Sequence, residues 1–145
     1  MVPTSGTLRF VLHARAEPGR ELARIEFGPA DLPALRAAVQ RVASAYVPAR
    51  AADVVLAVHE VAVNSLIHGG GHGCLCVHHT GNELVFDVHD DNGTPNAPAV
   101  QPLSADATRG RGLWLAERLT DGLHIDTGPD ATSVRLHLLV DADRR

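Results

Sequence analysis

The stretch Ala51–Gly71, AADVVLAVHEVAVNSLIHGGG, predicts a helix that is apolar on most sides and ends at a run of three glycines. Three polar residues within it, Glu60, Asn64 and His68, are spaced four apart. Each step of four advances by roughly 40° around a helix, so these side chains line one side. A helix of this composition is normally buried on most faces. A buried carboxylate or carboxamide without a partner is costly, so the polar stripe must face a wet cavity or a ligand.

The rest of this helix is apolar, which supports burial. The side opposite the stripe and the two flanks carry only aliphatic residues: Val55, Val58, Ala62 and Leu66 opposite, Val54 and Val61 on one flank, and Leu56, Val63 and Ile67 on the other.

Length and composition limit the kind of protein. A chain of 145 residues with 45% hydrophobic residues predicts one globular domain spanning 1–145. The net charge of -4 and the absence of a basic cluster argue against nucleic-acid binding, and 3% aromatic residues argue against base stacking. No uncharged apolar run reaches membrane-spanning length and no signal peptide is evident, so we expect no membrane association and a cytoplasmic location. Two cysteines fit a reducing compartment.

The segments before the central helix predict two strands and one helix. Residues 7–14 and 22–27 alternate like strands and are joined by a turn, which suggests an N-terminal hairpin. Asp31 is a candidate cap for a helix that continues at helical spacing to Tyr46, and Pro48 ends it. Asp53 is a candidate cap for the central helix.

Two further hairpins and a short helix follow the glycine run. Residues 74–80 and 83–89 form the first hairpin around Gly81-Asn82, and 123–127 and 132–140 form the last. The intervening residues 94–108 have little periodicity, and a loop of that length is usually a lid, a binding loop or disordered. A short helix opens at residues 109–112 and continues to Leu119, with Trp114 expected in packing.

This order of elements predicts an α+β fold, a two-layer sandwich with a mostly antiparallel sheet and helices on one face. Such a fold can bring together the central helix, the Asp91-Asn92-Gly93 turn and the glycine-rich helix start. Backbone N–H groups at that start suit phosphate. Asn64 offers an oxygen for Mg²⁺, and Glu60 could accept a proton from an attacking hydroxyl. Asp91 could accept a hydrogen bond from an exocyclic amine.

These motifs resemble the nucleotide-binding boxes of the GHKL superfamily of ATPases. The resemblance covers nearly the whole chain in order, and the helix motif with its His-Gly ending is fairly specific. The short single-domain form resembles the RsbW/SpoIIAB type of anti-sigma factor serine/threonine kinase. The matching segments are Glu60-x-x-x-Asn64-x-x-x-His68-Gly69, Asp91-x-Gly93, Gly110-Arg111-Gly112-Leu113 and Thr132.

The resemblance implies a Bergerat-type site for ATP and Mg²⁺. Asn64 would hold Mg²⁺ and Glu60 would be the general base, while His68 is expected to be a structural residue. Asp91 would bind the adenine amino group with support from Thr132. Asp90 is a rival for this role, but only Asp91 lies two residues before Gly93. The remaining implied contacts are Gly93 at the base, and Gly110, Gly112 and Leu113 in the phosphate-binding turn. Arg109 and Arg111 are either solvated loop charges or phosphate contacts.

Partners follow from the resemblance too. Relatives of this type transfer the γ-phosphate to a serine of a small anti-anti-sigma (STAS-type) protein and sequester a sigma factor, often as homodimers. This sequence departs from the family pattern at Pro95 and Ala131, where glycines are usual. Neither change removes a chemical group, so ATP binding is better supported than kinase activity.

Two alternatives to a kinase stay open. One is an ATP-binding module that sequesters a partner without phosphotransfer. The other is a zinc or copper protein, because six His and Cys residues lie within twelve positions. Against a metal site, the period-2 spacing divides these residues between two strand faces and there is no CxxC pair. The six are His68, His72, Cys74, Cys76, His78 and His79.

Overall fold

A computed structural model describes residues 19–90, 111–128 and 131–140. The described residues form five strands, three α-helices and two short 3-10 helices. In order they are β1 (Arg20–Phe27), η1 (Pro29–Asp31), α2 (Leu32–Tyr46), η2 (Pro48–Arg50), α3 (Ala51–His68), β2 (Gly73–Thr80), β3 (Glu83–Asp90), α4 (Arg111–Leu119), β4 (Gly122–Thr127) and β5 (Thr132–Leu139).

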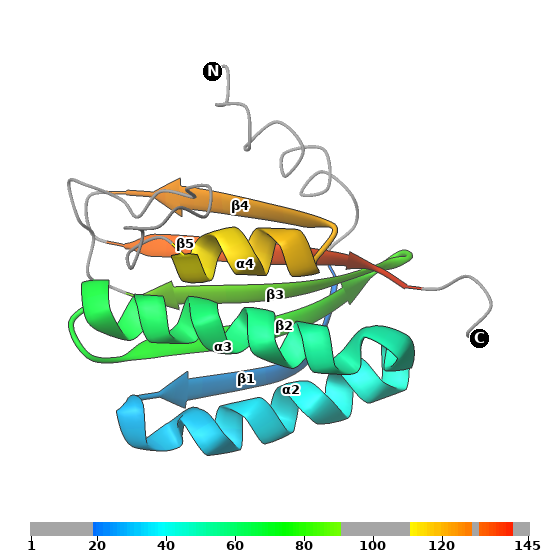
Figure 1. Cartoon of the computed structure of the whole chain (residues 1–145), viewed down its shortest axis with the longest axis horizontal. Helices are drawn as coiled ribbons and strands as arrows, with labels where there is room; N and C mark the ends of the chain where they lie inside the picture. Colours follow the sequence, from blue (N-terminus) through cyan, green and yellow to red (C-terminus); the bar gives the residue numbers. More distant parts are fainter. Residues whose placement is uncertain (1–18, 91–110, 129–130, 141–145) are drawn as a thin grey trace.

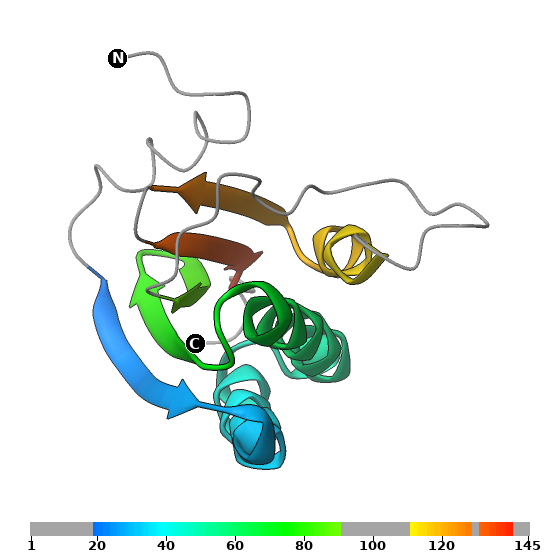
Figure 2. The same ribbon diagram turned by 90° about the vertical axis from the view of Figure 1, so that its left-hand side faces the viewer.

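The molecule has two layers. The five strands form one antiparallel sheet in the order β1-β2-β3-β5-β4. Helices α2, α3 and α4 lie side by side on one face of this sheet (Figures 1 and 2). The α+β sandwich predicted from the sequence is therefore confirmed.

Helix α3 is the centre of the hydrophobic core. It packs between α2 and α4 and contacts β2 and β3. Alternate residues of β3 face it, namely Leu84, Phe86 and Val88, and all three are buried. The helix buries a matching set of small aliphatic side chains: Val54, Ala57, Val58, Val61 and Ala62.

One flank of α3 is more exposed than its composition suggested. The side chains of Leu56 and Ile67 are 41% and 70% exposed, and Val63 between them is half-buried. Glu60 and Asn64 are half-buried beside this flank. The polar stripe therefore lies at the margin of the buried face, where a side chain can reach both the core and solvent.

Asp31 stands at the predicted N-cap position of α2 but makes no side-chain capping hydrogen bond, and the prediction of Asp53 as a cap of α3 is wrong. Asp31 precedes α2, but its carboxylate accepts a hydrogen bond from the N–H of Gly28 at 2.9 Å and closes the preceding turn η1. Asp53 lies in the first turn of α3, which begins at Ala51 because the turn η2 leads directly into it. An acidic residue in a first turn still interacts favourably with the helix dipole.

The glycine run after α3 reverses the chain toward β2 as expected. Gly70 and Gly71 have φ angles of 87° and 94°, which favour glycine strongly. This turn brings β2 back beneath α3, and β2 then pairs with both β1 and β3.

The predicted N-terminal hairpin is only partly covered. The strand expected at 22–27 is present as β1, which pairs with β2. The strand expected at 7–14, the loop 94–108 and the chain end after residue 140 lie outside the described residues.

Residues 48–68, comprising η2 and α3, are long and apolar enough to cross a membrane by length and composition alone. In the described fold this helix is the central element of the core, packed between two other helices.

Candidate functional site

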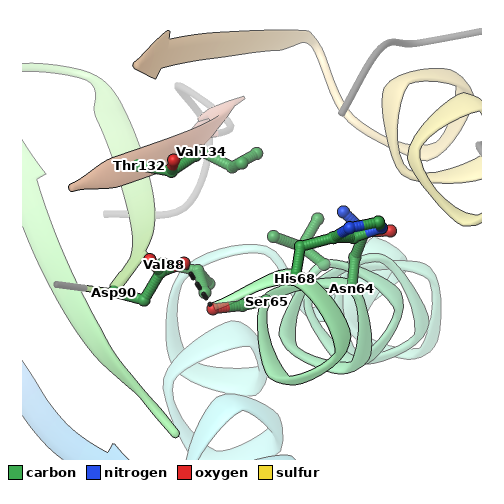
Figure 3. Close-up of a pocket in the computed structure, with 8 residues that line it drawn as sticks. Asn64, Ser65, His68, Val88, Asp90, Thr132 and Val134 are labelled. Atoms are coloured by element: carbon green, nitrogen blue, oxygen red, sulfur yellow. Dashed lines mark hydrogen bonds between the residues drawn. The ribbon is translucent and has the colours of Figure 1, made fainter. Parts of the chain in front are cut away.

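A small pocket lies between the second half of α3 and the adjoining ends of β3 and β5 (Figure 3). Polar side chains from all three elements line it together with a few aliphatic ones. The lining residues are Val61, Asn64, Ser65 and His68 from α3, Val88 and Asp90 from β3, and Thr132 and Val134 from β5. Two members of the predicted stripe, Asn64 and His68, thus share a pocket with the predicted Thr132.

Asp90 is held tightly at one side of this pocket. It is the last residue of β3, its side chain is buried, and the hydroxyl of Ser65 donates a hydrogen bond to its Oδ2 at 3.2 Å (Figure 3). A methyl group at Gly69 would collide with this carboxylate. The glycine after His68 is therefore needed for Asp90 to approach the end of α3.

Thr132 lies beside Asp90 because the two residues are register partners in the β3–β5 ladder. The side chain of Thr132 is buried, and its Oγ1 has no hydrogen-bond partner in the described part of the chain. A buried hydroxyl without a partner is unfavourable, so this atom needs a ligand or a water.

Glu60 lies one turn before Asn64 and faces the start of α4. A Cβ atom built on Gly112 would be 2.7 Å from Glu60 Oε1 and 3.4 Å from Glu60 Cβ. Gly112 is the second residue of α4. The absence of a side chain at position 112 is thus what allows the carboxylate to lie against this helix start.

Two of the other predicted site residues, Leu113 and Arg111, lie in the described part of α4, and the remaining ones do not. The side chain of Leu113 is fully buried in the hydrophobic core. Arg111 begins α4, but its side chain is outside the description. Asp91, Gly93, Arg109 and Gly110 lie outside the described residues.

Sequence reasoning did not identify Ser65, and it treated Asp90 only as a rival of Asp91, which lies outside the described residues. The signal for Asp90 was present, because strand alternation continues the buried series of Leu84, Phe86 and Val88 to position 90. Asp91 was preferred because it lies two residues before Gly93, as the family motif requires, whereas Asp90 lies three residues before it. Ser65 follows Asn64 directly, and no sequence pattern distinguished it.

The cavity has a volume of about 10 Å³. That is room for roughly one water molecule. A larger ligand must therefore displace side chains or extend from this pocket toward Glu60 and the start of α4.

The six His and Cys residues of the metal alternative do not form one cluster. His68 lines the pocket on the helix side of the sheet. The ring of His79 packs against Tyr46 of α2 with a centroid distance of 4.8 Å. Among the described residues, no group of three or more His, Cys, Asp or Glu side chains is placed to hold one metal ion.

Comparison with protein families finds a match to the histidine kinase-like ATPase domain over residues 25–138. The matched region contains all the described elements of the pocket. Comparison with curated proteins gives no match.

Two solved structures resemble the fold. The RsbU and RsbW domains of Rv1364c from Mycobacterium tuberculosis match with 17% identity and a TM-score of 0.60, covering 86% of this chain and 34% of that one. The histidine kinase domain of the E. coli osmosensor EnvZ matches with 21% identity and a TM-score of 0.47, covering 90% of this chain and 96% of that one. This chain therefore spans about a third of the solved Mycobacterium tuberculosis chain.

Proposed function

The chain belongs to the histidine kinase-like ATPase domain family, and from that membership we propose that its pocket binds Mg²⁺-ATP and that it phosphorylates a serine of a partner protein. The observation that carries the ATP site is the buried hydroxyl of Thr132, which has no hydrogen-bond partner among the described residues and lies next to the buried carboxylate of Asp90. A donor–acceptor edge such as that of adenine supplies partners for both groups.

The adenine amino group donates to an aspartate at the end of β3 in this proposal. We infer that Asp90 is that residue, because it faces the pocket and Ser65 orients its carboxylate. Asp91, two residues before Gly93, is the alternative that sequence spacing favours. In either case Thr132 supports the base from β5, and Gly93 lets the backbone pass close to it.

The phosphates extend from there toward α4. Asn64 supplies an oxygen ligand to Mg²⁺, which when bound neutralises phosphate charge. Backbone N–H groups at the start of α4, from Gly110 to Gly112, bind phosphate oxygens with Arg109 and Arg111 as flanking cations. The contact of Glu60 with Gly112 supports this arrangement, since it brings the candidate base to the phosphate end.

Glu60 then acts as general base on the serine hydroxyl of the partner. The carboxylate accepts the hydroxyl proton as the serine oxygen attacks the γ-phosphate, and ADP leaves.

The partner is proposed to be an anti-anti-sigma protein, with a sigma factor as the sequestered target. The sequence resemblance to RsbW/SpoIIAB kinases and the structural similarity to a protein with an RsbW domain support this. We further propose a cytoplasmic location, which fits a partner of this kind, and a homodimeric assembly.

The test uses two variants of the stripe. Asn64→Ala is expected to weaken Mg²⁺-ATP binding by at least tenfold in calorimetry. Glu60→Gln is expected to bind ATP within about threefold of wild type while losing phosphotransfer by 10²–10⁴-fold. Equal ATP affinity in wild type and Asn64→Ala would contradict the site assignment.

A second function, sequestration without phosphotransfer, is favoured by Pro95 and Ala131, which replace glycines usual in the family. An affinity pull-down with and without ATP, followed by phosphosite mapping of retained proteins, separates the two functions. A partner retained in an ATP-dependent manner but carrying no phosphoserine would establish the sequestering function.

A further inference from the structure

Cys74 and Cys76 lie on the face of the sheet that is turned away from the helices. Their neighbours in β2, Leu75 and Val77, point into the core, so strand alternation directs the two cysteines to the other side. Both thiols are free, and their sulfur atoms are 4.0 Å apart. The two thiols are therefore neighbours in space, although one residue separates them in the chain.

We propose that Cys74 and Cys76 are a modification site that forms a reversible disulfide by exchange with the disulfide of a small thiol such as glutathione. Residues two apart in a strand have Cα atoms about 6.6 Å apart. Disulfides usually join Cα atoms about 4.4–6.8 Å apart, so this pair lies at the upper end of the range and closing the bond shortens β2 slightly. Disulfides at the limit of this range are readily reduced, which suits a reversible modification rather than a permanent crosslink.

Exposure determines which of the two cysteines reacts first. Cys74 is half-buried and lines a cavity of about 170 Å³, whereas Cys76 is only 4% exposed. Burial also raises the pKa of the Cys76 thiol to about 11, so this thiol retains its proton more firmly. Cys74 is therefore the thiol that an external disulfide reaches, and Cys76 is the one that reacts in the second step.

The exchange has two steps. The thiolate of Cys74 attacks one sulfur of glutathione disulfide, which forms a mixed disulfide and releases one glutathione thiolate. Cys76 then loses its proton and attacks the sulfur of Cys74, which releases the second glutathione. The two cysteine thiols are oxidised to one disulfide, glutathione disulfide is reduced to two glutathione molecules, and the two cysteine protons end on the glutathione sulfurs. The short distance between the sulfurs favours the second step, because both reacting groups belong to one strand.

Gly73 connects this pair of cysteines to the nucleotide pocket. It precedes Cys74 directly, and a Cβ atom built on it would lie 3.0 Å from Ser65 Oγ. Ser65 in turn donates the hydrogen bond that orients Asp90, and Asp90 lines the cavity beside Cys74 as well. Shortening of β2 at this end is therefore expected to displace Ser65 and Asp90 and to weaken ATP binding. This consequence rests on the proposed function, whereas formation of the disulfide does not.

The experiment exposes the full chain to glutathione disulfide, followed by thiol counting and peptide mapping by mass spectrometry. Wild type is expected to lose both free thiols and the mass of two hydrogen atoms, with the link inside the peptide that contains both cysteines. Cys76→Ser is expected to stop at a glutathione adduct on Cys74, because no second thiol displaces the glutathione. Cys74→Ser is the matched control and is expected to react at least about tenfold more slowly, because its remaining thiol is buried.

Four outcomes in wild type would overturn the proposal: two thiols that stay free, an adduct on Cys74 that never resolves, a disulfide between two chains, or an internal disulfide that excess reduced glutathione does not reopen. Circular dichroism identifies a serine variant that fails to fold. The peptide map of wild type then decides alone, since it needs no substitution.

Calorimetry with Mg²⁺-ATP tests the connection to the pocket. Oxidised wild type is expected to bind ATP about fivefold more weakly than reduced wild type, while the same treatment leaves the affinity of Cys74→Ser unchanged. Equal affinities of the oxidised and reduced forms would contradict this connection. Reduced wild type that binds no ATP would contradict the proposed function instead, and the thiol count and peptide map would still decide whether the disulfide forms.

Discussion

Single residues determine how closely the polar groups of the pocket approach one another. Gly69 gives Asp90 room at the end of α3, and Gly112 gives Glu60 room at the start of α4. In both places a glycine faces a carboxylate from another element. The chain therefore uses missing side chains to bring charged groups against backbone.

Asp90 and Asp91 can be separated by the same substitution at each position. Asp90→Asn is expected to weaken ATP binding at least tenfold, because the oriented acceptor becomes an amide that cannot match the adenine amino group in the same way. Asp91→Asn is expected to remain within about threefold of wild type. Calorimetry with Mg²⁺-ATP measures both, and the reverse order of effects would assign the role to Asp91.

Cys76 gives the stability of the protein a dependence on alkaline pH. Its pKa is raised from 9.0 to about 11 in the folded chain, mainly by burial. The unfolded chain loses the proton at lower pH than the folded chain. Stability is therefore complete below about pH 9 and falls between pH 9 and 11, by at most about 1.4 kcal/mol per pH unit.

Urea unfolding at several pH values measures this effect. Cys76→Ala should show a flatter profile than wild type above pH 9. The sequence contains no lysine and one tyrosine, so few other groups titrate in this range. Parallel profiles for the two proteins would contradict the assigned shift.

At the scale of elements, α4 is anchored at its C-terminal end. Arg50, just before α3, donates hydrogen bonds to the carbonyl of Leu119 at 3.2 Å and to Asp121 at 2.8 Å. Asp121 also accepts the backbone N–H of Leu139 at 2.8 Å. These contacts join the start of α3, the end of α4 and β5 at one place.

Removing the two partners of this anchor should have unequal costs. Arg50→Ala is expected to destabilise the fold by less than about 1 kcal/mol, because the ion pair is about one-third exposed. Asp121→Ala is expected to cost about 1–2 kcal/mol, because it removes the hydrogen bond from the Leu139 N–H in addition to the ion pair. Denaturant unfolding of both variants checks this order.

The elements were largely predictable because their residue patterns are local. Alternation and turn residues placed β2, β3 and β5 within one or two residues, and helical spacing placed α2 and α3. Helix starts were less predictable, since Asp31 bonds to Gly28 and η2 leads directly into α3. Strand alternation places Asp90 on the helix-facing side of β3, whereas glycine spacing favours Asp91, which lies outside the described residues.

For the molecule as a whole, the core beneath the three helices supplies the stability that holds the pocket. The neighbouring residues Leu138 and Leu139 in β5 allow a direct test, since Leu138 is fully buried and Leu139 is 53% exposed. Leu138→Ala is expected to cost about 2–5 kcal/mol. Leu139→Ala should stay within about 0.5 kcal/mol. Similar losses in thermal and urea unfolding would contradict the described orientation of β5.

Both ends of the segment that joins β3 to α4 are fixed by the scaffold, since Asp90 is held by Ser65 and α4 is packed on α3. For a connection between fixed points, each doubling of length costs only about 0.6 kcal/mol in closure entropy. The fold of the described residues is therefore expected to tolerate changes of length between residues 91 and 110, provided that both of these fixed points are kept.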